Sequence, residues 1–580
     1  MSVLIGGCSH QNIPEEKESA ITAAPTETTE TTAPPETTEP PTTAATEPTA
    51  PPTTAATEPT APAVVWETGY IAAAHPDAAY CDSAGNVLGT FLRGTQVEYM
   101  ITPEGICAIR VDDTEVYLQE GASVVADVAG IIPEHTLYVR TAVNLRDADG
   151  RLLAAFAEKG TPVQVTGYDY LQEDGQVHMY RVNCGGGEGY MKPWYLADNE
   201  ADAIANYDDG SYGIHAARDD QYGGGGAANL DYYPREKGAI PGNEMPEECR
   251  ALYLANWSID QVEEYIAIAA NSGINAFVVD ILDGGAVGYA ADVMSTYCPT
   301  GAAAAYNSVE AYQTAIQKLK DAGFYVIGRI ATFNDSYYAI DHPEHAIADL
   351  DGNPLELAGE YWPSPYQRPV WQYKVDLAVE AVELMGFHEI QFDYVRFPDS
   401  TWRYEDAGTI DFRNASGESK AQAIQRFLMY AADILHEKGV YVSADVYGES
   451  AYNYVTAYGQ YWPAISNVVD AISGMPYPDH FSASGEWRPW EHPYDTLYSW
   501  GECAMLRQSE TATPAAVRTW IQAYNAIREP YNTYGPEEVS AQIKALRDTG
   551  CTGGYMTWNA AASLDKYASL MPAFAPPVAP

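Results

Sequence analysis

From Cys249 to Asn559 the chain alternates between short apolar segments and longer amphipathic ones, and this alternation restricts the possible folds more than any other feature. The short segments are rich in Val, Ile and aromatic residues, as expected for buried parallel strands. They cover 251–257, 275–282, 325–333, 389–397, 440–448, 469–478, 518–525 and 553–559. The long segments have helical periodicity and cover 258–273, 308–323, 370–386, 420–439 and 536–550. Eight sequential strands with helices between them predict an α/β fold, a closed (β/α)8 TIM barrel over 245–570, rather than an open doubly wound sheet.

Polar and aromatic side chains collect at the C-terminal ends of these strands, where TIM barrels hold their functional residues. Carboxylates at such a position can donate and accept protons at a glycosidic bond. Aromatic faces can stack on sugar rings. We therefore predict that the following residues bind substrate: Asp280, Arg329, Tyr394, Arg396, Tyr447, Glu449, Tyr477, Trp558 and Asn559.

Two acids are the predicted catalytic pair, Asp393 on the fourth strand and Asp445 on the fifth. Alternate residues of a strand share a face, so Gln391 lies on the face of Asp393 and Ser443 on that of Asp445. Adjacent strands lie ~4.8 Å apart. If both faces point into the barrel, the two carboxyl groups come close to the roughly 5–5.5 Å separation of retaining glycosidases.

Other roles for these residues stay open. Glu449 competes with Asp445 as the acid/base, and Asp479 is a weaker rival. Asp393 and Arg396 could instead form a structural ion pair that closes the end of the barrel.

The charge balance excludes some partners. The chain has 31 basic and 80 acidic residues and a net charge of −49, which argues against nucleic acid and against anionic lipid surfaces. Its eight cysteines include no CxxC pair, and no histidines show the spacing of a zinc site. We therefore predict neither a metal site nor a cofactor.

The N-terminal residues predict attachment to a cell surface. The run IGGC, which ends at Cys8, resembles the lipobox of a bacterial lipoprotein, and the resemblance implies that Cys8 is lipidated. Residues 21–63 consist almost entirely of Thr, Pro, Glu and Ala, and PTTAATEPTAP occurs there twice in tandem. Such a composition buries too little apolar area to offset chain entropy. We predict a lipoprotein-like segment (1–20), a disordered linker (21–63) and an extracellular location.

One pattern occurs twice between the linker and the barrel, in 79–97 and 144–163. Each copy predicts a strand, a tight Asp-x-x-Gly turn at Asp82 or Asp147, a second strand, and Gly-Thr before a third. The pattern resembles the bacterial SH3-like domains that are common on cell-wall proteins.

The SH3-like resemblance implies two small all-β modules, 64–127 and 128–200, followed by a connecting segment, 201–244. It also implies that the modules bind peptidoglycan or another wall polymer. The alternative is that they are spacers packed against the barrel.

The barrel resembles a family of bacterial proteins classed as glycoside hydrolases. The residues that carry the resemblance are GFHEIQFDYVRFP (386–398), INAFVVDILD (274–283) and GVYVSADVYG (439–448). The resemblance implies a TIM barrel in which the Asp that ends strand four is the nucleophile, here Asp393, with Asp445 as its partner.

These inferences together predict a glycoside hydrolase that acts on an extracellular or cell-wall polysaccharide by two-carboxylate, retaining catalysis. The alternative function is that of a non-catalytic surface lipoprotein that binds glycan or cell wall. A metal-dependent polysaccharide deacetylase is disfavoured because the strand ends lack a histidine cluster.

Overall fold

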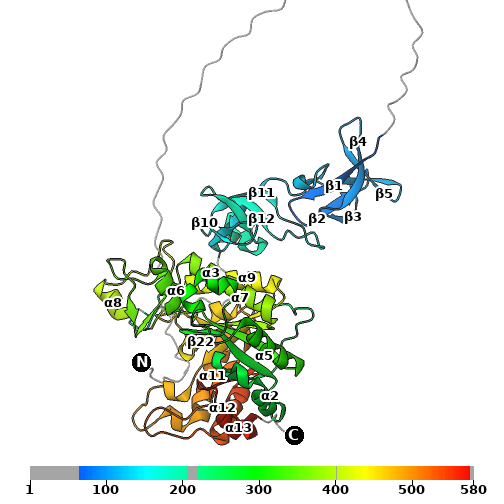
Figure 1. Ribbon diagram of the computed structural model, residues 1–580. Coiled ribbons are helices and arrows are strands. Elements are labelled where there is room, and N and C mark those ends of the chain that lie inside the picture. Colours follow the sequence, from blue (N-terminus) through cyan, green and yellow to red (C-terminus); the bar gives the residue numbers. More distant parts are fainter. Residues whose placement is uncertain (1–64, 206–217, 219, 400, 575–580) are drawn as a thin grey trace, which may run out of the picture.

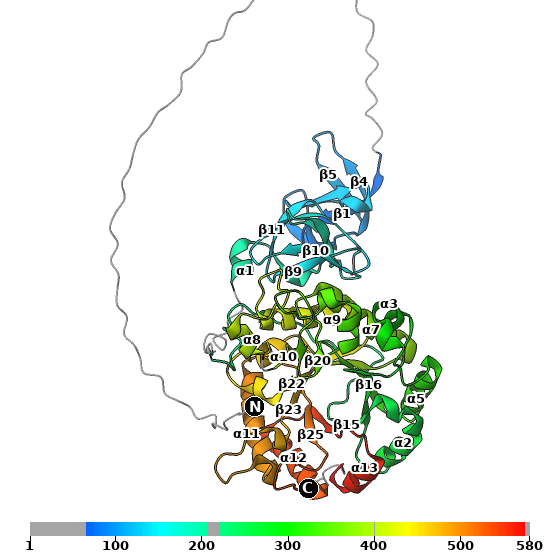
Figure 2. The same ribbon diagram turned by 60° about the vertical axis from the view of Figure 1, so that its left-hand side comes forward.

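The computed structural model describes residues 65–205, 218, 220–399 and 401–574. Two small β units lead into one large α/β domain, and the second β unit lies between the first and the large domain (Figures 1 and 2). The predicted segment 1–20, its lipidation site Cys8 and the predicted linker 21–63 lie outside the described residues. Within those residues, no helix is both long enough and apolar enough to cross a membrane.

The two β units are antiparallel sheets of seven strands each with the same topology. The first has the order β3-β2-β6-β5-β4-β1-β7 and the second β10-β9-β13-β12-β11-β8-β14, which is the first order with each number raised by seven. The first contains β1 (Glu67–Ala73), β2 (Asp77–Cys81), β3 (Val87–Leu92), β4 (Gln96–Ile101), β5 (Cys107–Val111), β6 (Thr114–Leu118) and β7 (Ala122–Val125). The second contains β8 (His135–Val139), β9 (Val143–Arg146), β10 (Leu152–Ala157), β11 (Pro162–Tyr168), β12 (Tyr180–Asn183), β13 (Glu188–Met191) and β14 (Leu196–Ala197), before α1 (Glu200–Ile204).

The predicted repeat is confirmed at the turn that it shares. Asp82 Oδ1 accepts hydrogen bonds from the second and fourth backbone N–H groups after it, and Asp147 Oδ1 does the same. Gly85 and Gly150 close the two turns with φ of 87° and 82°, a left-handed conformation that glycine adopts without strain. The same Asp-x-x-Gly turn therefore connects the two strands of both hairpins.

The large domain is built on parallel strands. They are β15 (Cys249–Leu254), β16 (Ala276–Asp283), β18 (Tyr325–Ala331), β21 (Glu389–Asp393), β22 (Tyr441–Tyr447), β23 (Ala471–Met475), β24 (Ala516–Val517), β25 (Thr519–Gln522) and β26 (Gly554–Trp558). The hydrogen-bonded order runs from β24 through β23, β22, β21, β18, β16, β15 and β26 to β25. Only Arg518 separates β24 from β25 in the chain. The two ends of the sheet therefore meet, and the sheet curls into a nearly closed barrel.

Helices surround this sheet (Figure 2). They are α2 (Val262–Ala270), α3 (Asp292–Tyr297), α4 (Pro299–Ala302), α5 (Val309–Asp321), α6 (Ser336–Asp341), α7 (Arg368–Met385), α8 (Trp402–Ala407), α9 (Lys420–Glu437), α10 (Trp462–Ser466), α11 (Pro493–Ser509), α12 (Pro536–Thr549) and α13 (Leu564–Leu570). All five predicted helices are present. The predicted start at residue 258 falls instead in a 3-10 turn, η4 (Asn256–Gln261), which precedes α2. The sequence analysis missed α11.

Alternate residues point into the barrel, as the strand period predicts. At the N-terminal end of β21, the buried Glu389 pairs with Arg518 at 2.7 Å and accepts hydrogen bonds from Ser443 and Tyr325 at 2.5 and 3.0 Å. Two residues further along, the Gln391 amide lies 3.4 Å from Ser473 Oγ. The barrel therefore has a polar interior that leads up to Asp393 at the C-terminal end of β21.

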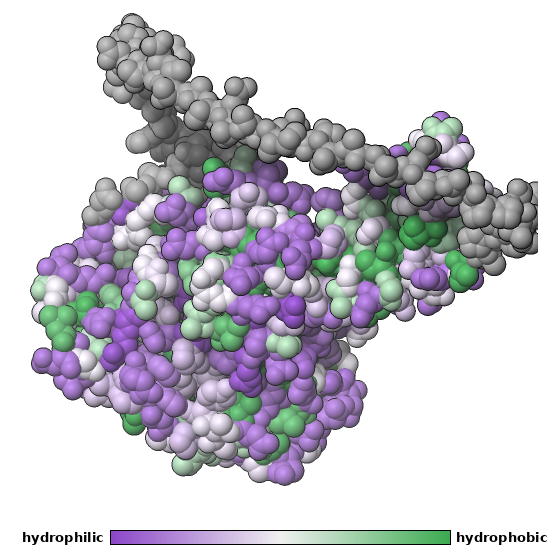
Figure 3. Space-filling view, turned by 90° about the horizontal axis from the view of Figure 1, so that it is seen from above, coloured by the Kyte–Doolittle hydropathy of each residue, from purple (hydrophilic) through white to green (hydrophobic). Residues whose placement is uncertain are grey.

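The surface seen in Figure 3 is mostly hydrophilic over the large domain, whereas hydrophobic side chains gather on the β units at the right of the view. The first β unit exposes Val87, Leu88, Ile101 and Ile106, each more than half accessible.

Asp433 of α9 joins the second β unit to the large domain. This carboxylate is buried and accepts hydrogen bonds from Arg146, Tyr195 and Arg235 at 2.5, 2.7 and 2.9 Å. Burial alone would raise the pKa of Asp433, but the guanidinium groups of Arg146 and Arg235 outweigh burial and lower it.

We expect Asp433→Asn to reduce the free energy of unfolding by about 3–5 kcal/mol, because it leaves two buried guanidinium groups without their counterion. Urea denaturation measures this loss. The matched control is Glu383→Gln, whose exposed partner Lys438 lies 2.6 Å away; this change should cost no more than about 1 kcal/mol. Equal effects of the two substitutions would contradict a structural role for Asp433.

Candidate active site

One guanidinium group occupies the centre of the barrel's C-terminal end. Arg329 of β18 is 1% exposed. Its Nη1 lies 2.6 Å from Asp280 and 3.1 Å from Asp283, two acids of β16. Its Nη2 and Nε lie 2.5 and 3.1 Å from Asp393 Oδ2. Three acids from two strands therefore share one positive charge.

Asp445 is the fourth acid at this guanidinium. Phe392 pairs with Ala444 in the sheet, so the next residues along, Asp393 and Asp445, are neighbours. Asp445 Oδ2 lies 3.7 Å from Arg329 Nε, the atom that also donates to Asp393. The two carboxyl oxygens are thus separated by no more than the sum of these two distances. This upper limit on the separation is larger than the roughly 5–5.5 Å of retaining glycosidases and lies near the lower end of the ~6.5–9.5 Å of inverting ones.

Charge balance requires protons in this cluster, since one guanidinium cannot neutralise four carboxylates in a buried site. Asp445 is fully buried, and burial together with the nearby Asp393 carboxylate raises the pKa of Asp445 well above its ordinary value. Burial also raises the pKa of Asp280 to about 7, and the Arg329 guanidinium only partly opposes this rise.

Asp393 and Asp445 differ in their hydrogen-bond partners. Asp393 Oδ2 accepts two N–H groups of Arg329, an arrangement that favours the carboxylate anion. Asp445 Oδ1 accepts from the Trp520 indole N–H at 2.7 Å, while its Oδ2 has no hydrogen-bond partner among the described residues. The pair can therefore hold one ionised and one protonated carboxyl side by side, which is what a nucleophile and a general acid require.

The backbone after Asp393 is strained. Tyr394 has φ of 48°, a left-handed conformation that is costly for a tyrosine, and strain of this kind clusters at functional sites. This turn ends β21 directly beside the Asp393 carboxylate.

Arg396 does not pair with Asp393, so the alternative prediction of a structural ion pair between them is wrong. Among the described residues, Arg396 forms an ion pair with Asp399 at 3.3 Å and donates to the Tyr447 hydroxyl at 2.6 Å. Its guanidinium also lies over the rings of Trp362 and Tyr447, 5.1 and 4.4 Å from their centres. The partner of Asp393 comes instead from β18.

A cavity of about 340 Å³ lies among the loops that follow β22, β23 and β25, and none of the four acids at Arg329 lines it. Glu449 lines it and accepts from the hydroxyls of Tyr454 and Tyr458 at 2.9 and 3.0 Å. Burial raises the pKa of Glu449. Asp479 also lines the cavity, but it is fully buried and held by the Tyr524 hydroxyl at 2.8 Å.

The other predicted binding residues lie around the same end of the barrel. Trp558 stands 5.5 Å from the Arg329 guanidinium and packs against Tyr253 at 4.7 Å. Tyr477 and Asn559 are buried, and the Asn559 side-chain nitrogen has no hydrogen-bond partner in the described part of the chain.

Two residues of this site were not predicted from the sequence. Tyr253 donates its hydroxyl to Asp280, and Trp520 donates to Asp445. Trp520 could have been predicted from the two-residue period of a strand, since Arg518 and Trp520 lie on the same inward face of the seventh predicted strand.

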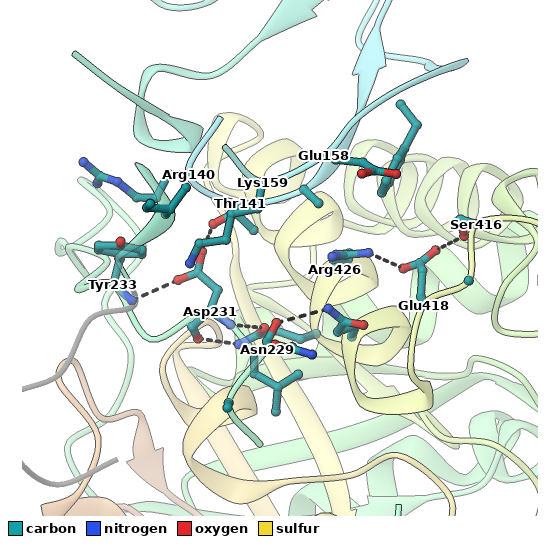
Figure 4. A pocket seen from close by; sticks show the side chains of 18 residues that line it. Arg140, Thr141, Glu158, Lys159, Asn229, Asp231, Tyr233, Ser416, Glu418 and Arg426 are labelled. Carbon is teal, nitrogen blue, oxygen red and sulfur yellow. Dashed lines mark hydrogen bonds and ion pairs between the residues drawn. The ribbon is translucent and has the colours of Figure 1, made fainter. Parts of the chain in front are cut away.

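A second group of cavities lies away from the strand ends, between the second β unit and the large domain. One encloses about 380 Å³, and a neighbouring one of about 830 Å³ shares Phe156, Glu158 and Ser416 with it. In Figure 4, the side chains of Arg140 and Lys159 lie above Asp231, and Glu418 lies between Arg426 and Ser416. Both polar contacts of Glu418 there are short, at 2.8 and 2.5 Å.

We expect Asp445→Asn and Asp393→Asn to have opposite consequences for stability. The pKa of Asp445 is raised in the folded state, so its contribution to stability is present below pH ~4 and is lost as pH rises toward that raised pKa. Asparagine imitates the protonated carboxyl but does not titrate, so Asp445→Asn should match the unmutated chain within about 1 kcal/mol at pH ~4 and should be the more stable of the two at pH 7. It should also flatten the decline of stability with rising pH.

Asp393→Asn should instead cost roughly 3 kcal/mol, because it removes the anion that Arg329 holds with two N–H groups. Urea denaturation of the three proteins between pH 4 and 8 measures both effects. A larger loss in Asp445→Asn than in Asp393→Asn would contradict this assignment of the protons.

Three solved structures are similar to parts of the chain. A hypothetical protein from Ruminiclostridium thermocellum ATCC 27405 is 32% identical, over 34% of this chain and 97% of that one, with a TM-score of 0.28. The PgaB (BpsB) glycoside hydrolase domain from Bordetella bronchiseptica is 13% identical, over 56% of this chain and 99% of that one, with a TM-score of 0.41. The spore cortex-lytic enzyme SleL of Bacillus megaterium QM B1551 is 9% identical, over 57% and 76%, with a TM-score of 0.33.

No curated protein matches the chain. A family model matches residues 251–564, which is more than half of the chain and contains every strand of the barrel from β16 to β26. The chain therefore belongs to the family described as "Putative glycosyl hydrolase domain".

Proposed function

We propose that this protein is a glycoside hydrolase that cleaves an extracellular or cell-wall polysaccharide with retention of configuration, with Asp393 as nucleophile and Asp445 as acid/base. The observation that carries the proposal is the sharing of Arg329 Nε by the two carboxyl groups, at 3.1 and 3.7 Å. The assignment rests on proximity and on the difference in protonation between the two acids.

The proposed reaction uses this difference in two steps. The protonated Asp445 carboxyl gives its proton to the glycosidic oxygen while Asp393 attacks the anomeric carbon and forms a glycosyl–enzyme bond. The Asp445 carboxylate then takes a proton from water, which attacks the anomeric carbon and releases Asp393. Arg329 stays in contact with both acids and limits the negative charge between them.

We treat the barrel as a (β/α)8 TIM barrel for this purpose, with β24 and β25 counted as one strand interrupted at Arg518. In such barrels the strand C-termini carry the chemistry. The position of the Arg329 cluster at that end supports the catalytic role.

We further propose that the two β units are SH3-like modules that bind peptidoglycan or another wall polymer, and that lipidation of Cys8 holds the protein at the cell surface. The exposed apolar side chains of the first unit, among them Val87 and Ile101, support a contact with a partner.

A non-catalytic glycan-binding protein is the second candidate function. Its support is the low exposure of the acids, since Asp445 is fully buried and Asp393 is 6% exposed. In that case Arg329 and the four acids would form a structural network, and glycan would bind without being cleaved.

The first experiment is to incubate the full chain with peptidoglycan and a panel of soluble polysaccharides and to measure new reducing ends. We expect Asp393→Asn to lower the rate at least about a thousandfold while substrate binding persists. The matched control is Asp321→Asn on the exposed end of α5, which should leave the rate unchanged. Binding without any cleavage by the unmutated protein would favour the second candidate function.

Variants of Asp445 and Glu449 identify the acid/base. Loss of the proton donor slows cleavage of polysaccharide but spares the first step for an aryl glycoside, whose leaving group needs no proton. We expect Asp445→Ala to behave in this way and Glu449→Ala to slow both substrates alike. If Glu449→Ala spares the aryl glycoside, the acid/base role moves to Glu449.

A further inference from the structure

Three potential metal ligands come together away from the barrel axis, just after α6. They are His342, Glu344 and His345, and one ligand atom of each lies within 4.8 Å of the others. His342 Nδ1 is 3.3 Å from Glu344 Oε1, and His345 Nε2 is 4.0 Å from the same oxygen. Ligands of a tetrahedral zinc ion stand roughly 3.3–3.5 Å apart, given metal–ligand bonds of about 2.0–2.1 Å.

Each imidazole is held by the nitrogen that faces away from Glu344. His342 Nε2 lies 2.7 Å from the carbonyl oxygen of Tyr297, which can only accept a hydrogen bond, so the proton is on Nε2 and Nδ1 has a free lone pair. His345 Nδ1 lies 3.0 Å from the Tyr338 hydroxyl, which can accept the Nδ1 proton and leave Nε2 free. Metal-binding histidines are typically oriented in this way by a second partner.

Stacking fixes the two rings further. Tyr338 lies 4.5 Å from the ring of His342 and 6.0 Å from that of His345, and it stacks on Tyr373 at 4.8 Å. The ring positions are therefore set by the folded chain, and only the exposed Glu344 side chain would have to move to complete a site.

We propose that His342, Glu344 and His345 bind one divalent transition-metal ion of the Zn²⁺ class, with a fourth position left to solvent. Two imidazoles and one carboxylate suit Zn²⁺, whereas Ca²⁺ and Mg²⁺ prefer sites made of oxygen atoms. In the neutral ring, the lone pair of His342 Nδ1 faces the Glu344 carboxylate oxygen at 3.3 Å, where a cation would bridge them; in the doubly protonated ring Nδ1 donates to that oxygen instead.

Such an ion would join two loops at the functional end of the barrel. Tyr297 ends α3 in the connection after β16, whereas the three ligands follow α6 in the connection after β18. The second connection also carries Trp362, which packs on Arg396. The ion would therefore stiffen a loop that borders the candidate active site.

The sequence offers little warning of this site. His342 and His345 are separated by two residues in DHPEH, a spacing that is common without metal, and the carbonyl group that orients His342 belongs to the distant Tyr297. Arg413 is the main opposing charge; its guanidinium donates to the carbonyl oxygens of Ala346 and Pro343 beside the cluster.

The test uses the full chain after treatment with EDTA. Titration with ZnCl₂ at neutral pH, followed by calorimetry and by metal analysis after dialysis, should show one ion bound per chain. Co²⁺ in place of Zn²⁺ should give the visible absorption of a tetrahedral site.

Substitutions assign the bound ion to its ligands. We expect His342→Gln and His345→Gln each to weaken Zn²⁺ binding at least tenfold, and Glu344→Gln to weaken it less, because that side chain is the most exposed. The matched control is His75→Gln, an exposed histidine of the first β unit, which should leave Zn²⁺ binding unchanged. Thermal unfolding of the metal-free variants checks that they remain folded.

The proposal is overturned if the unmutated chain binds no Zn²⁺ in a saturable way, or if His342→Gln/His345→Gln binds it as tightly as the unmutated chain. Both readouts are independent of hydrolase activity. A failure of the proposed glycosidase function would therefore leave this result unaffected.

Discussion

The charge on Arg329 is the constraint around which the functional end of the barrel is arranged. A single buried guanidinium is in contact with Asp280, Asp283, Asp393 and Asp445. Four carboxylates against one cation would leave a large uncompensated charge in a site of low polarity, so protons must make up the difference. Burial, together with the nearby acids, raises the pKa values of Asp445 and Asp280. The cluster thereby places Asp445, an acid with a raised pKa, beside Asp393, which pairs with Arg329.

The opposite ratio of charges occurs where the second β unit meets the large domain. There Asp433 has two arginine partners, and its pKa is lowered rather than raised. At the N-terminal end of the barrel, Glu389 and Arg518 are matched one to one. All three buried networks pair carboxylates with guanidinium groups, but they differ in the ratio of acids to arginines. The excess of cations at Asp433 keeps that carboxylate ionised, which suits structure. The excess of acids at Arg329 leaves protons to transfer, which suits catalysis.

Much of the fold could be predicted because the strands repeat two simple signals. Short apolar segments indicated every barrel strand, and the two-residue period of a strand predicted that Gln391 and Ser443 point inward. Helix α11 was missed because its buried face is mixed in polarity: it includes Leu497 and Trp500 but also Arg507 and Gln508. Gln508 is buried because it accepts from the Trp462 indole and the Ser466 hydroxyl, and such long-range partners leave no periodic trace in the sequence.

Several residues of the site could be predicted from the sequence, but not which of them pair with one another. Position at a strand end was enough to select Asp393, Asp445 and Arg329. It could not tell that Arg329 rather than Arg396 holds Asp393, because the distinction depends on which side chain points inward. Arg329 lies on an inward face of β18, level with Gln391 in the sheet. Arg396 comes after the left-handed turn at Tyr394, beyond the end of β21.

That turn also bears on access to the two acids. Asp445 has a raised pKa because it is buried, yet a general acid must come within hydrogen-bond distance of the leaving oxygen. Asp393 neighbours Asp445 on the adjacent strand, and the backbone directly after Asp393 is strained at Tyr394. Strain at this position lowers the cost of a local rearrangement. Asp393, whose carboxylate helps to raise the pKa of Asp445, is thus followed directly by the strained residue, and under the proposed mechanism a movement of that segment would let a sugar reach both acids.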